Sequence, residues 1–405
     1  MVETNLLKNE TEKGALGHLF HVNVRVKVHF WILAIGFVAF FSCGETKQMT
    51  ESETVFSEKK KIIGYVAGWK GVDTARIHAE KLTHINYAFA NVIEGLVTEG
   101  EGRLEQDREN MKKLHSLKSK NPDLKILISI GGWTWSKGFS DAVLTEESRK
   151  KFTNSAINYL IRHDLDGLDF DWEYPGMEGD GNIFRVEDRE NFVLMLKSVR
   201  EALDSLQEVT GKYYLNTIAS AGFKKYLEVN DLGAAQNYLD FINIMTYDFV
   251  GPGTDTTAHH TNLFNPKEGG RSAAQAVYDH VEAGVPIEKL VMGLAFYGKS
   301  WKNVEDENNG LYQPGEWNRT FPFLQLKELE SQKEFERFWD DESQAPFLWN
   351  RLDRVFISYE DPESIAAKVK FIKENKLGGA MFWEYNEDSE DRDLLNAIFE
   401  NMYNP

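Results

Sequence analysis

The feature that most constrains the fold is an alternation, from residue 60 onward, of short β-rich runs with longer helical patterns. The eight β-rich runs cover residues 61–69, 82–90, 125–130, 167–172, 214–219, 241–247, 290–296 and 379–384. The helical patterns between them include residues 146–163, 188–206, 272–283 and 362–376. Eight β/α units in one chain favour a closed parallel barrel over an open sheet, so we predict an α/β fold of the (β/α)8 TIM-barrel type.

The chain is longer than a barrel of eight units requires. Such a barrel takes roughly 250 residues, whereas residues 60–405 span about 345. Part of the excess lies between the seventh and eighth β-rich runs, in a segment rich in Trp, Phe and Glu that holds a further strand candidate at 354–359. We therefore predict a small α+β insertion at about 301–359, within a barrel domain of residues 60–405.

Residues 1–43 resemble a targeting segment rather than part of the fold. A basic stretch precedes an uncharged apolar run at 30–41, which is too short for a bilayer span of roughly 20 residues and is typical of a secretory signal. Cys43, the only cysteine, follows directly and resembles a bacterial lipoprotein processing site. We expect an exported protein, either anchored at the cell envelope through lipidated Cys43 or secreted after cleavage of a plain signal peptide. The polar residues 44–59 predict a flexible tether.

Composition excludes several classes of function. The chain carries 46 basic and 64 acidic residues, a formal charge of −18, so we expect no nucleic-acid partner. A single cysteine excludes a disulfide framework and a Cys-based zinc module. Aromatic residues make up 13% of the chain and include ten tryptophans, a content compatible with carbohydrate binding.

The acidic run at 166–174 is the strongest indication of chemistry. Alternate residues of a strand share a face, so Asp169, Asp171 and Glu173 point one way, and the apolar residues between them point into the helix layer. A solvated charge run does not explain the pattern, because both faces of a barrel strand are covered. Three carboxyls in a barrel interior repel one another and hold at least one proton.

Glu173 is the acid nearest the C-terminal end of its strand, where the active sites of barrel enzymes lie. A carboxyl whose pKa is raised by acidic neighbours suits a general acid at neutral pH. A magnesium or calcium site made by the three carboxylates is the competing interpretation, weakened because the motif itself contains no histidine.

These residues are similar to a known family. The motif Asp166-x-x-Asp169-x-Asp171-x-Glu173 resembles the signature of glycoside hydrolase family 18, the chitinases. Further stretches resemble the family's third-, sixth- and eighth-strand motifs, in the order Ser129-Ile130-Gly131-Gly132-Trp133-Thr134, Met245-Thr246-Tyr247-Asp248 and Phe382-Trp383-Glu384. The resemblance covers about residues 60–400. The insertion after Tyr297-Gly298 also resembles the subdomain that deepens the cleft in many of the family's chitinases.

The resemblance implies a retaining, substrate-assisted mechanism, in which the acetamido group of the substrate replaces a carboxylate nucleophile. Glu173 would protonate the bridging oxygen and later activate water. Asp171 would accept a hydrogen bond from the acetamide N–H and stabilise the oxazolinium intermediate. Asp169 would share a proton with Asp171, and Tyr247 would donate its hydroxyl to the acetamide oxygen.

The resemblance also implies a set of substrate-binding residues, with Trp383 as the floor of the cleaved subsite. They are Gly131, Gly132, Trp133, Thr134, Tyr174, Met245, Asp248, Trp383, Tyr65, Phe89 and Lys299. The two glycines would let the backbone approach the sugar closely, although a pair of glycines also suits a simple turn, and core packing is an alternative role for Tyr65 and Phe89. Further candidates for stacking on a longer chain are Trp135, Tyr174, Trp301 and Trp317. Lys299 stands where family members often carry arginine, so contacts to the substrate there would differ.

We therefore expect a chitinase that cuts β-1,4 bonds of chitin or chitooligosaccharides as a monomer, without a cofactor or metal. The chain would meet a membrane only through an N-terminal lipid anchor. An endo-β-N-acetylglucosaminidase acting on glycoprotein N-glycans is the alternative. A chitin-binding lectin on the same barrel is disfavoured because Glu173 is present, and a metal-dependent hydrolase would be inhibited by a chelator. The pair His259-His260 could suggest a metal site but is interpreted as part of a substrate-side loop.

Overall fold

The computed structural model describes residues 59–100, 102–266 and 270–404. The predicted targeting segment, Cys43 and almost all of the predicted tether lie outside the described residues. Within the described residues, no helix is both long and apolar enough to cross a membrane.

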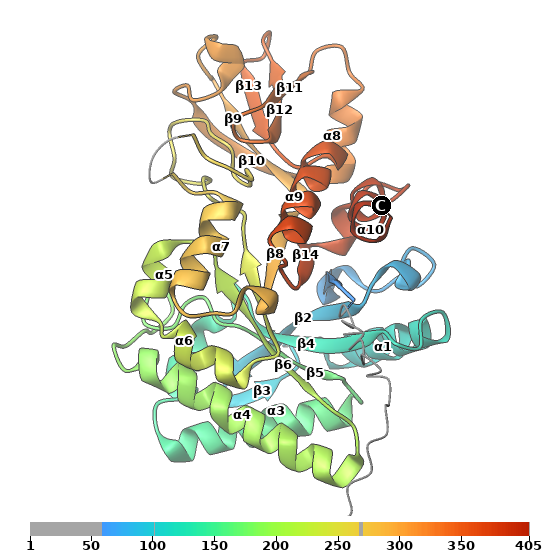
Figure 1. Cartoon of the computed structure of the whole chain (residues 1–405), viewed down its shortest axis with the longest axis vertical. Coiled ribbons are helices and arrows are strands. Elements are labelled where there is room, and N and C mark those ends of the chain that lie inside the picture. Colours follow the sequence, from blue (N-terminus) through green and yellow to red (C-terminus); the bar gives the residue numbers. More distant parts are fainter. Residues whose placement is uncertain (1–58, 101, 267–269, 405) are drawn as a thin grey trace, which may run out of the picture. The chain divides into compact units, whose positions relative to one another are not determined.

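Eight parallel strands form a closed barrel, which confirms the predicted fold class (Figure 1). β1 pairs in parallel with both β14 and β2, and this double pairing closes the ring. The strands are β1 (Lys61–Ala67), β2 (His84–Ile93), β4 (Lys125–Gly131), β5 (Gly167–Asp171), β6 (Leu215–Ala221), β7 (Phe241–Met245), β8 (Leu290–Ala295) and β14 (Gly379–Trp383). Each overlaps one of the eight predicted β-rich runs. A short strand outside the prediction, β3 (Leu96–Thr98), pairs with the end of β2.

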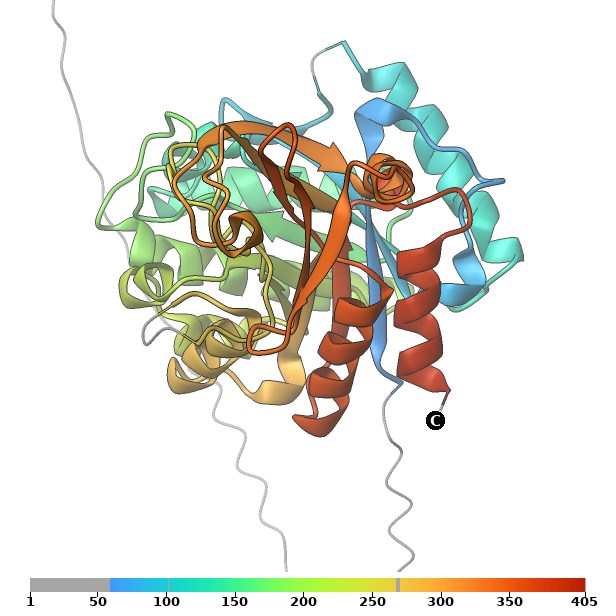
Figure 2. The ribbon, with the colours of Figure 1, turned by 90° about the horizontal axis from the view of Figure 1, so that it is seen from above.

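Helices surround the strands (Figure 2). The longer ones are α1 (Leu104–Ser116), α3 (Glu146–Arg162), α4 (Asp188–Thr210), α7 (Ala273–Glu282), α9 (Pro362–Glu374) and α10 (Asp393–Tyr403), with short helices at α2 (Phe139–Ala142), α5 (Lys224–Val229) and α6 (Leu232–Ala235). Local sequence fixes two of the starts, because Thr145 with Ser148 and Asp361 with Ser364 form reciprocal capping boxes at α3 and α9. The apolar faces of the helices pack on the outward-facing residues of the strands in one large core.

A second, antiparallel sheet lies between β8 and β14 in the sequence, with strand order β10-β9-β13-β12-β11. Its elements are β9 (Tyr297–Lys302), β10 (Glu316–Pro322), α8 (Phe323–Glu330), β11 (Glu336–Asp340), β12 (Ala345–Asn350) and β13 (Val355–Ser358). The sheet begins at Tyr297, before the predicted start at 301. Because β9 follows the C-terminal end of β8 directly, the insertion rises from that end of the barrel (Figure 1).

The insertion has its own hydrophobic core, which corrects the prediction for two tryptophans. Trp301 is fully buried, packs edge-on against Trp317 at 5.6 Å between ring centroids, and donates its indole N–H to the Thr254 carbonyl oxygen at 3.0 Å. Neither tryptophan lines the cleft described below. Both serve the packing of the insertion, so the expectation that they stack on substrate is wrong.

Candidate active site

A cleft of about 1010 Å³ opens at the C-terminal end of the barrel. Its walls come from the ends of most of the barrel strands and from the start of the insertion. The lining residues include Tyr65, Trp69, Phe89, Trp133, Thr134, Trp135, Asp171, Glu173, Tyr174, Phe223, Met245, Tyr247, Asp248, Arg271, Tyr297, Lys299 and Trp383. The cleft therefore collects most of the predicted site residues, which are distant from one another in the sequence.

The acidic strand β5 has the geometry that its alternation predicts. Asp169, Asp171 and Glu173 are 0%, 6% and 8% exposed and lie on the interior side of the barrel. The residues between them, Phe170 and Trp172, pack in the core between strands and helices. Asp171 and Glu173 line the cleft, whereas Asp169 lies deeper.

Asp169 is held by four hydrogen-bond donors. Its Oδ2 accepts from the hydroxyls of Tyr65 and Ser129, both at 2.8 Å. Its Oδ1 accepts from the Thr217 hydroxyl at 2.6 Å and from the Asn243 amide at 3.2 Å. Burial raises the pKa of Asp169, and these hydrogen bonds oppose the rise. Sequence reasoning placed Tyr65 among the substrate-binding residues and did not identify Thr217 or Asn243.

Asp171 contrasts with Asp169 because its buried Oδ1 has no hydrogen-bond partner. Burial, followed by the charges of Glu173 and Asp169, raises the pKa of Asp171 well above its usual range. Burial therefore favours the uncharged form of Asp171 over its carboxylate. Among the described residues no hydrogen bond joins Asp171 to Asp169.

Glu173 has the pKa of a general acid. Burial and, to a smaller degree, the charge of Asp248 raise its pKa to about 7, while a hydrogen bond with Tyr174 acts in the opposite direction. The backbone N–H of Glu173 donates to the Ser136 hydroxyl oxygen at 2.8 Å, and that hydroxyl also contacts the Gly132 carbonyl oxygen at 2.9 Å. Ser136 thus ties the end of β5 to the loop after β4, a role that the sequence did not reveal.

Tyr247 and Asp248 follow β7, and Asp248 adopts a positive φ of 60°. The Asp248 carboxylate accepts from the Tyr297 hydroxyl at 2.6 Å and pairs with the Lys299 ammonium at 2.7 Å. Partial burial raises the pKa of Asp248, but the nearby ring of His260 and the charge of Lys299 lower it well below its usual range. Lys299 thus forms an ion pair with Asp248 in this structure.

Aromatic rings form the floor and one wall of the cleft. Trp383 stacks on Phe89, with ring centroids 5.4 Å apart and planes 16° apart, and Tyr65 lies 5.9 Å from Trp383. Trp69, which the sequence analysis did not single out as a site residue, lies 6.2 Å from both Phe89 and Trp383 and is 47% exposed. These flat faces can stack on sugar rings.

A second group of aromatic residues lies on the loops that follow β4 and β5. Trp133 is 51% exposed and meets Tyr174 edge-on at 6.3 Å. Trp135 lines the cleft as well, with the Arg103 guanidinium 4.6 Å from its ring centroid. Aromatic side chains from the loops after β4 and β5 therefore line the cleft together with those from β2 and β14.

Gly131 and Gly132 make close contacts within the protein. Both have positive φ, 108° and 81°, and a Cβ at Gly131 would lie 2.2 Å from the Asp171 carbonyl oxygen. A Cβ at Gly132 would lie 2.7 Å from the ring of Phe89, and the Gly132 N–H donates to the Asp171 carbonyl oxygen at 2.7 Å. These glycines permit close contact with β5 and with a cleft aromatic, and they do not line the cleft themselves.

The described residues contain no cluster of three or more His, Cys, Asp and Glu side chains arranged to hold a metal ion. His259 instead pairs with Asp340 of the insertion, at 3.1 Å from Nε2 to Oδ2. His260 faces Asp248, at 3.7 Å from Nδ1 to Oδ1.

Comparisons with known proteins agree with the family resemblance found in the sequence. The profile described as "Glycosyl hydrolases family 18" matches residues 61–388. Chitinase A1 of Niallia circulans is 36% identical over 84% of this chain and 58% of that protein. Endochitinase 1 of Metarhizium robertsii is 31% identical over 82% of each chain. The chain thus spans little more than half the length of the first of these relatives.

Two solved structures are similar over 85% of this chain. Chitinase ChiW from Paenibacillus sp. FPU-7 has a TM-score of 0.80 and 39% identity, with 43% of that chain covered. A glycoside hydrolase family 18 N-acetylglucosaminidase from Paenibacillus barengoltzii has a TM-score of 0.77 and 38% identity, with all of that chain covered.

Proposed function

Because this chain belongs to glycosyl hydrolases family 18 and is therefore a glycoside hydrolase, we propose that it is a chitinase. It would cut β-1,4 bonds between N-acetylglucosamine units in chitin and chitooligosaccharides. The chitinases among its relatives support this substrate, and so does a cleft larger than a single sugar needs, lined by aromatic side chains from several loops.

The observation that carries the proposed mechanism is the pair formed by Glu173, with a pKa of about 7, and Asp171, whose pKa is raised well above its usual range by burial and by its acidic neighbours. At neutral pH a large fraction of Glu173 holds the proton that the bridging oxygen needs as its bond to the anomeric carbon breaks. The raised pKa of Asp171 disfavours the carboxylate form that a nucleophile needs. The acetamido oxygen of the substrate would therefore attack the anomeric carbon and form an oxazolinium ion.

Asp171 and Tyr247 would orient the acetamido group during this step. Nothing in the described structure holds Asp171 Oδ1, so the carboxyl can turn and accept the acetamide N–H. Tyr247 would donate its hydroxyl to the acetamide oxygen. After bond cleavage the Glu173 carboxylate would take a proton from water as that water opens the oxazolinium ring, and the product would keep the configuration of the substrate.

The test is product analysis on N-acetylglucosamine hexamer for wild type, Glu173→Gln and Asp171→Asn, with and without a chelator. Glu178→Gln is the matched control, because Glu178 is an exposed carboxyl in the same loop after β5. We expect disaccharide as the main product, no effect of the chelator, loss of activity in both site variants and full activity in the control.

Two outcomes would redirect the proposal. Wild type that leaves the hexamer intact but trims a high-mannose glycoprotein would be an endo-β-N-acetylglucosaminidase. Release of monosaccharide alone from the chain end would match the activity named for the P. barengoltzii structure.

We also propose that the protein is exported, on the grounds of the apolar run at 30–41 and Cys43. Labelling with a radioactive fatty acid in a bacterial host tests the anchor. Wild type should incorporate label and Cys43→Ser should not, whereas a labelled Cys43→Ser variant would contradict lipidation at this residue.

A further inference from the structure

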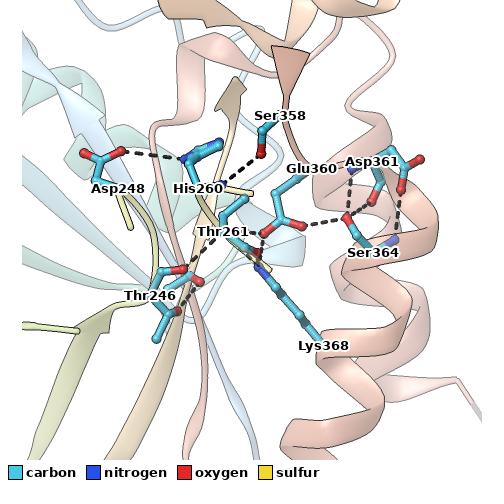
Figure 3. A network of polar contacts seen from close by, with 10 residues as sticks. Thr246, Asp248, His260, Thr261, Ser358, Glu360, Asp361, Ser364 and Lys368 are labelled. Atoms are coloured by element: carbon cyan, nitrogen blue, oxygen red, sulfur yellow. Dashed lines mark hydrogen bonds and ion pairs between the residues drawn. The ribbon is translucent and has the colours of Figure 1, made fainter. Parts of the chain in front are cut away.

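A buried ion pair lies behind the cleft, between α9 and the segment that joins it to β13 (Figure 3). Lys368 and Glu360 are 0% and 1% exposed. The Lys368 ammonium contacts Glu360 Oε1, the Thr261 carbonyl oxygen and, at 2.9 Å, the Thr261 hydroxyl oxygen. Glu360 Oε2 accepts from the Ser364 hydroxyl at 2.6 Å. All three donors of the ammonium and both carboxylate oxygens therefore have partners.

The pair holds the loop that follows β7. Thr261 Oγ1 lies 3.2 Å from the carbonyl oxygen of Thr246, the residue directly before Tyr247. The Phe249 N–H donates to the His260 carbonyl oxygen at 3.0 Å, so the two arms of the loop are joined twice. The part of the loop that carries Tyr247 and Asp248 is thus hydrogen-bonded to the part that Lys368 contacts.

A second attachment comes from the insertion itself. The His260 N–H donates to the Ser358 hydroxyl oxygen of β13 at 2.9 Å, and the His260 ring lies 3.7 Å from Asp248 (Figure 3). Both attachments join the loop to the end of the insertion and to the helix after it. Neither involves the barrel strands that flank β7.

Stability alone does not explain the pair. Removing an ammonium and a carboxylate from water is costly, and replacing a buried pair by apolar residues of similar volume is often neutral or stabilising. In some proteins a buried polar or ionic group is kept because it fixes one geometry. Here the geometry that it fixes is that of two cleft residues.

We propose that Lys368 and Glu360 are positioning residues, which hold the loop from residue 246 to 262 so that Tyr247 and Asp248 face the substrate. This proposal rests on the proposed function for the roles of Tyr247 and Asp248. Lys368 and Glu360 touch no substrate and act only through Thr261, Thr246 and His260.

The first test replaces the pair by apolar residues of similar volume, in the double variant Glu360→Leu/Lys368→Met. Lys370→Met is the matched control, because Lys370 lies on the same helix with its side chain 75% exposed. The measurements are kcat and KM on N-acetylglucosamine oligomers, the thermal unfolding temperature and hydrogen exchange of peptides from residues 246–262. We expect kcat to fall by about 10- to 100-fold with little change in KM, because a small misplacement of cleft groups costs rates of this size.

The double variant leaves the Thr261 carbonyl oxygen without its ammonium donor, so we expect an unfolding temperature slightly below that of wild type, and only the 246–262 peptides should exchange faster. If kcat and exchange both match those of Lys370→Met, the proposal is wrong. If wild type hydrolyses no N-acetylglucosamine oligomer, the proposed function fails, but the exchange measurement still decides whether the pair holds the loop.

Thr261→Val is the second variant, and it settles the question if the double variant does not fold. Valine keeps the shape of threonine and the ion pair but removes the hydroxyl that contacts Thr246, Glu360 and Lys368. We expect kcat to fall by about 2- to 10-fold, the equivalent of one hydrogen bond, with faster exchange of the same peptides. An unchanged kcat together with unchanged exchange in this folded variant would also overturn the proposal.

Discussion

Replacing Glu173 by glutamine should abolish hydrolysis but make the folded protein more stable at neutral and alkaline pH. The buried carboxyl has a pKa of about 7 in the folded protein, against an ordinary value of 4.5. Between these two pH values the folded state holds a proton that the unfolded chain has released. Because the folded state then binds more protons, the free energy of unfolding declines as the pH rises through this window.

The size of the effect follows from the two pKa values. Their difference corresponds to about 3 kcal/mol at about 1.4 kcal/mol for each pKa unit. Glutamine has nearly the same shape and carries no charge at any pH, so it avoids this destabilisation. The Glu173→Gln substitution also removes a charge that raises the pKa of Asp171. This second effect likewise makes the variant more stable than wild type as the pH rises.

The assay is urea unfolding of wild type, Glu173→Gln and the exposed control Glu178→Gln between pH 4.5 and pH 8. The stability of Glu173→Gln relative to wild type should increase by about 3 kcal/mol across this range, nearly all of it between pH 4.5 and pH 7. The control should follow wild type throughout. A Glu173→Gln variant whose stability relative to wild type does not change with pH would refute the claim that burial holds a proton on Glu173.

Three further outcomes are expected at the cleft. In wild type, kcat/KM for an N-acetylglucosamine oligomer should fall as the pH rises above about 7, because Glu173 loses its proton there; a rate that stays constant to pH 9 would exclude Glu173 as the acid. Lys299→Met should move this decline to higher pH, since the charge of Asp248 on Glu173 is then no longer offset, whereas Lys299→Arg should leave the profile in place. Trp383→Ala should lower kcat/KM by about 10- to 100-fold through loss of the aromatic floor on Phe89, measured on oligomers of several lengths, and an unchanged value would show that this floor does not bind sugar.

The barrel could be predicted because its signals are local. Alternation of β-rich and helical runs specifies eight β/α units, and the spacing of Asp169, Asp171 and Glu173 specifies one face of a strand wherever that strand lies. The C-terminal end of a parallel strand is always the same end of a barrel, so the position of Glu173 at the cleft also followed from the sequence.

The errors arose where a role depends on a partner distant in the sequence. Trp301 resembles an exposed stacking residue in the sequence, but the insertion folds around it with Trp317. The sequence likewise did not show that Gly131 and Gly132 have Asp171 and Phe89 as close neighbours.

The support behind the site was also beyond the reach of the sequence. Lys368 and Thr261 are 107 positions apart, and a lysine on an amphipathic helix gives no sign that it will be buried. Ser136 is an ordinary loop serine until β5 lies beside it and presents the N–H of Glu173. Such contacts appear only when the whole chain is folded.

The anomeric configuration of the first product formed from N-acetylglucosamine tetramer, followed by NMR during the first minutes of the reaction, tests the central claim most directly. Substrate-assisted hydrolysis with Glu173 as the acid predicts that the β anomer appears first and that the α anomer grows in later by mutarotation. An α anomer that appears first would mean that water attacks the anomeric carbon directly, and it would contradict the mechanism proposed for Glu173 and Asp171.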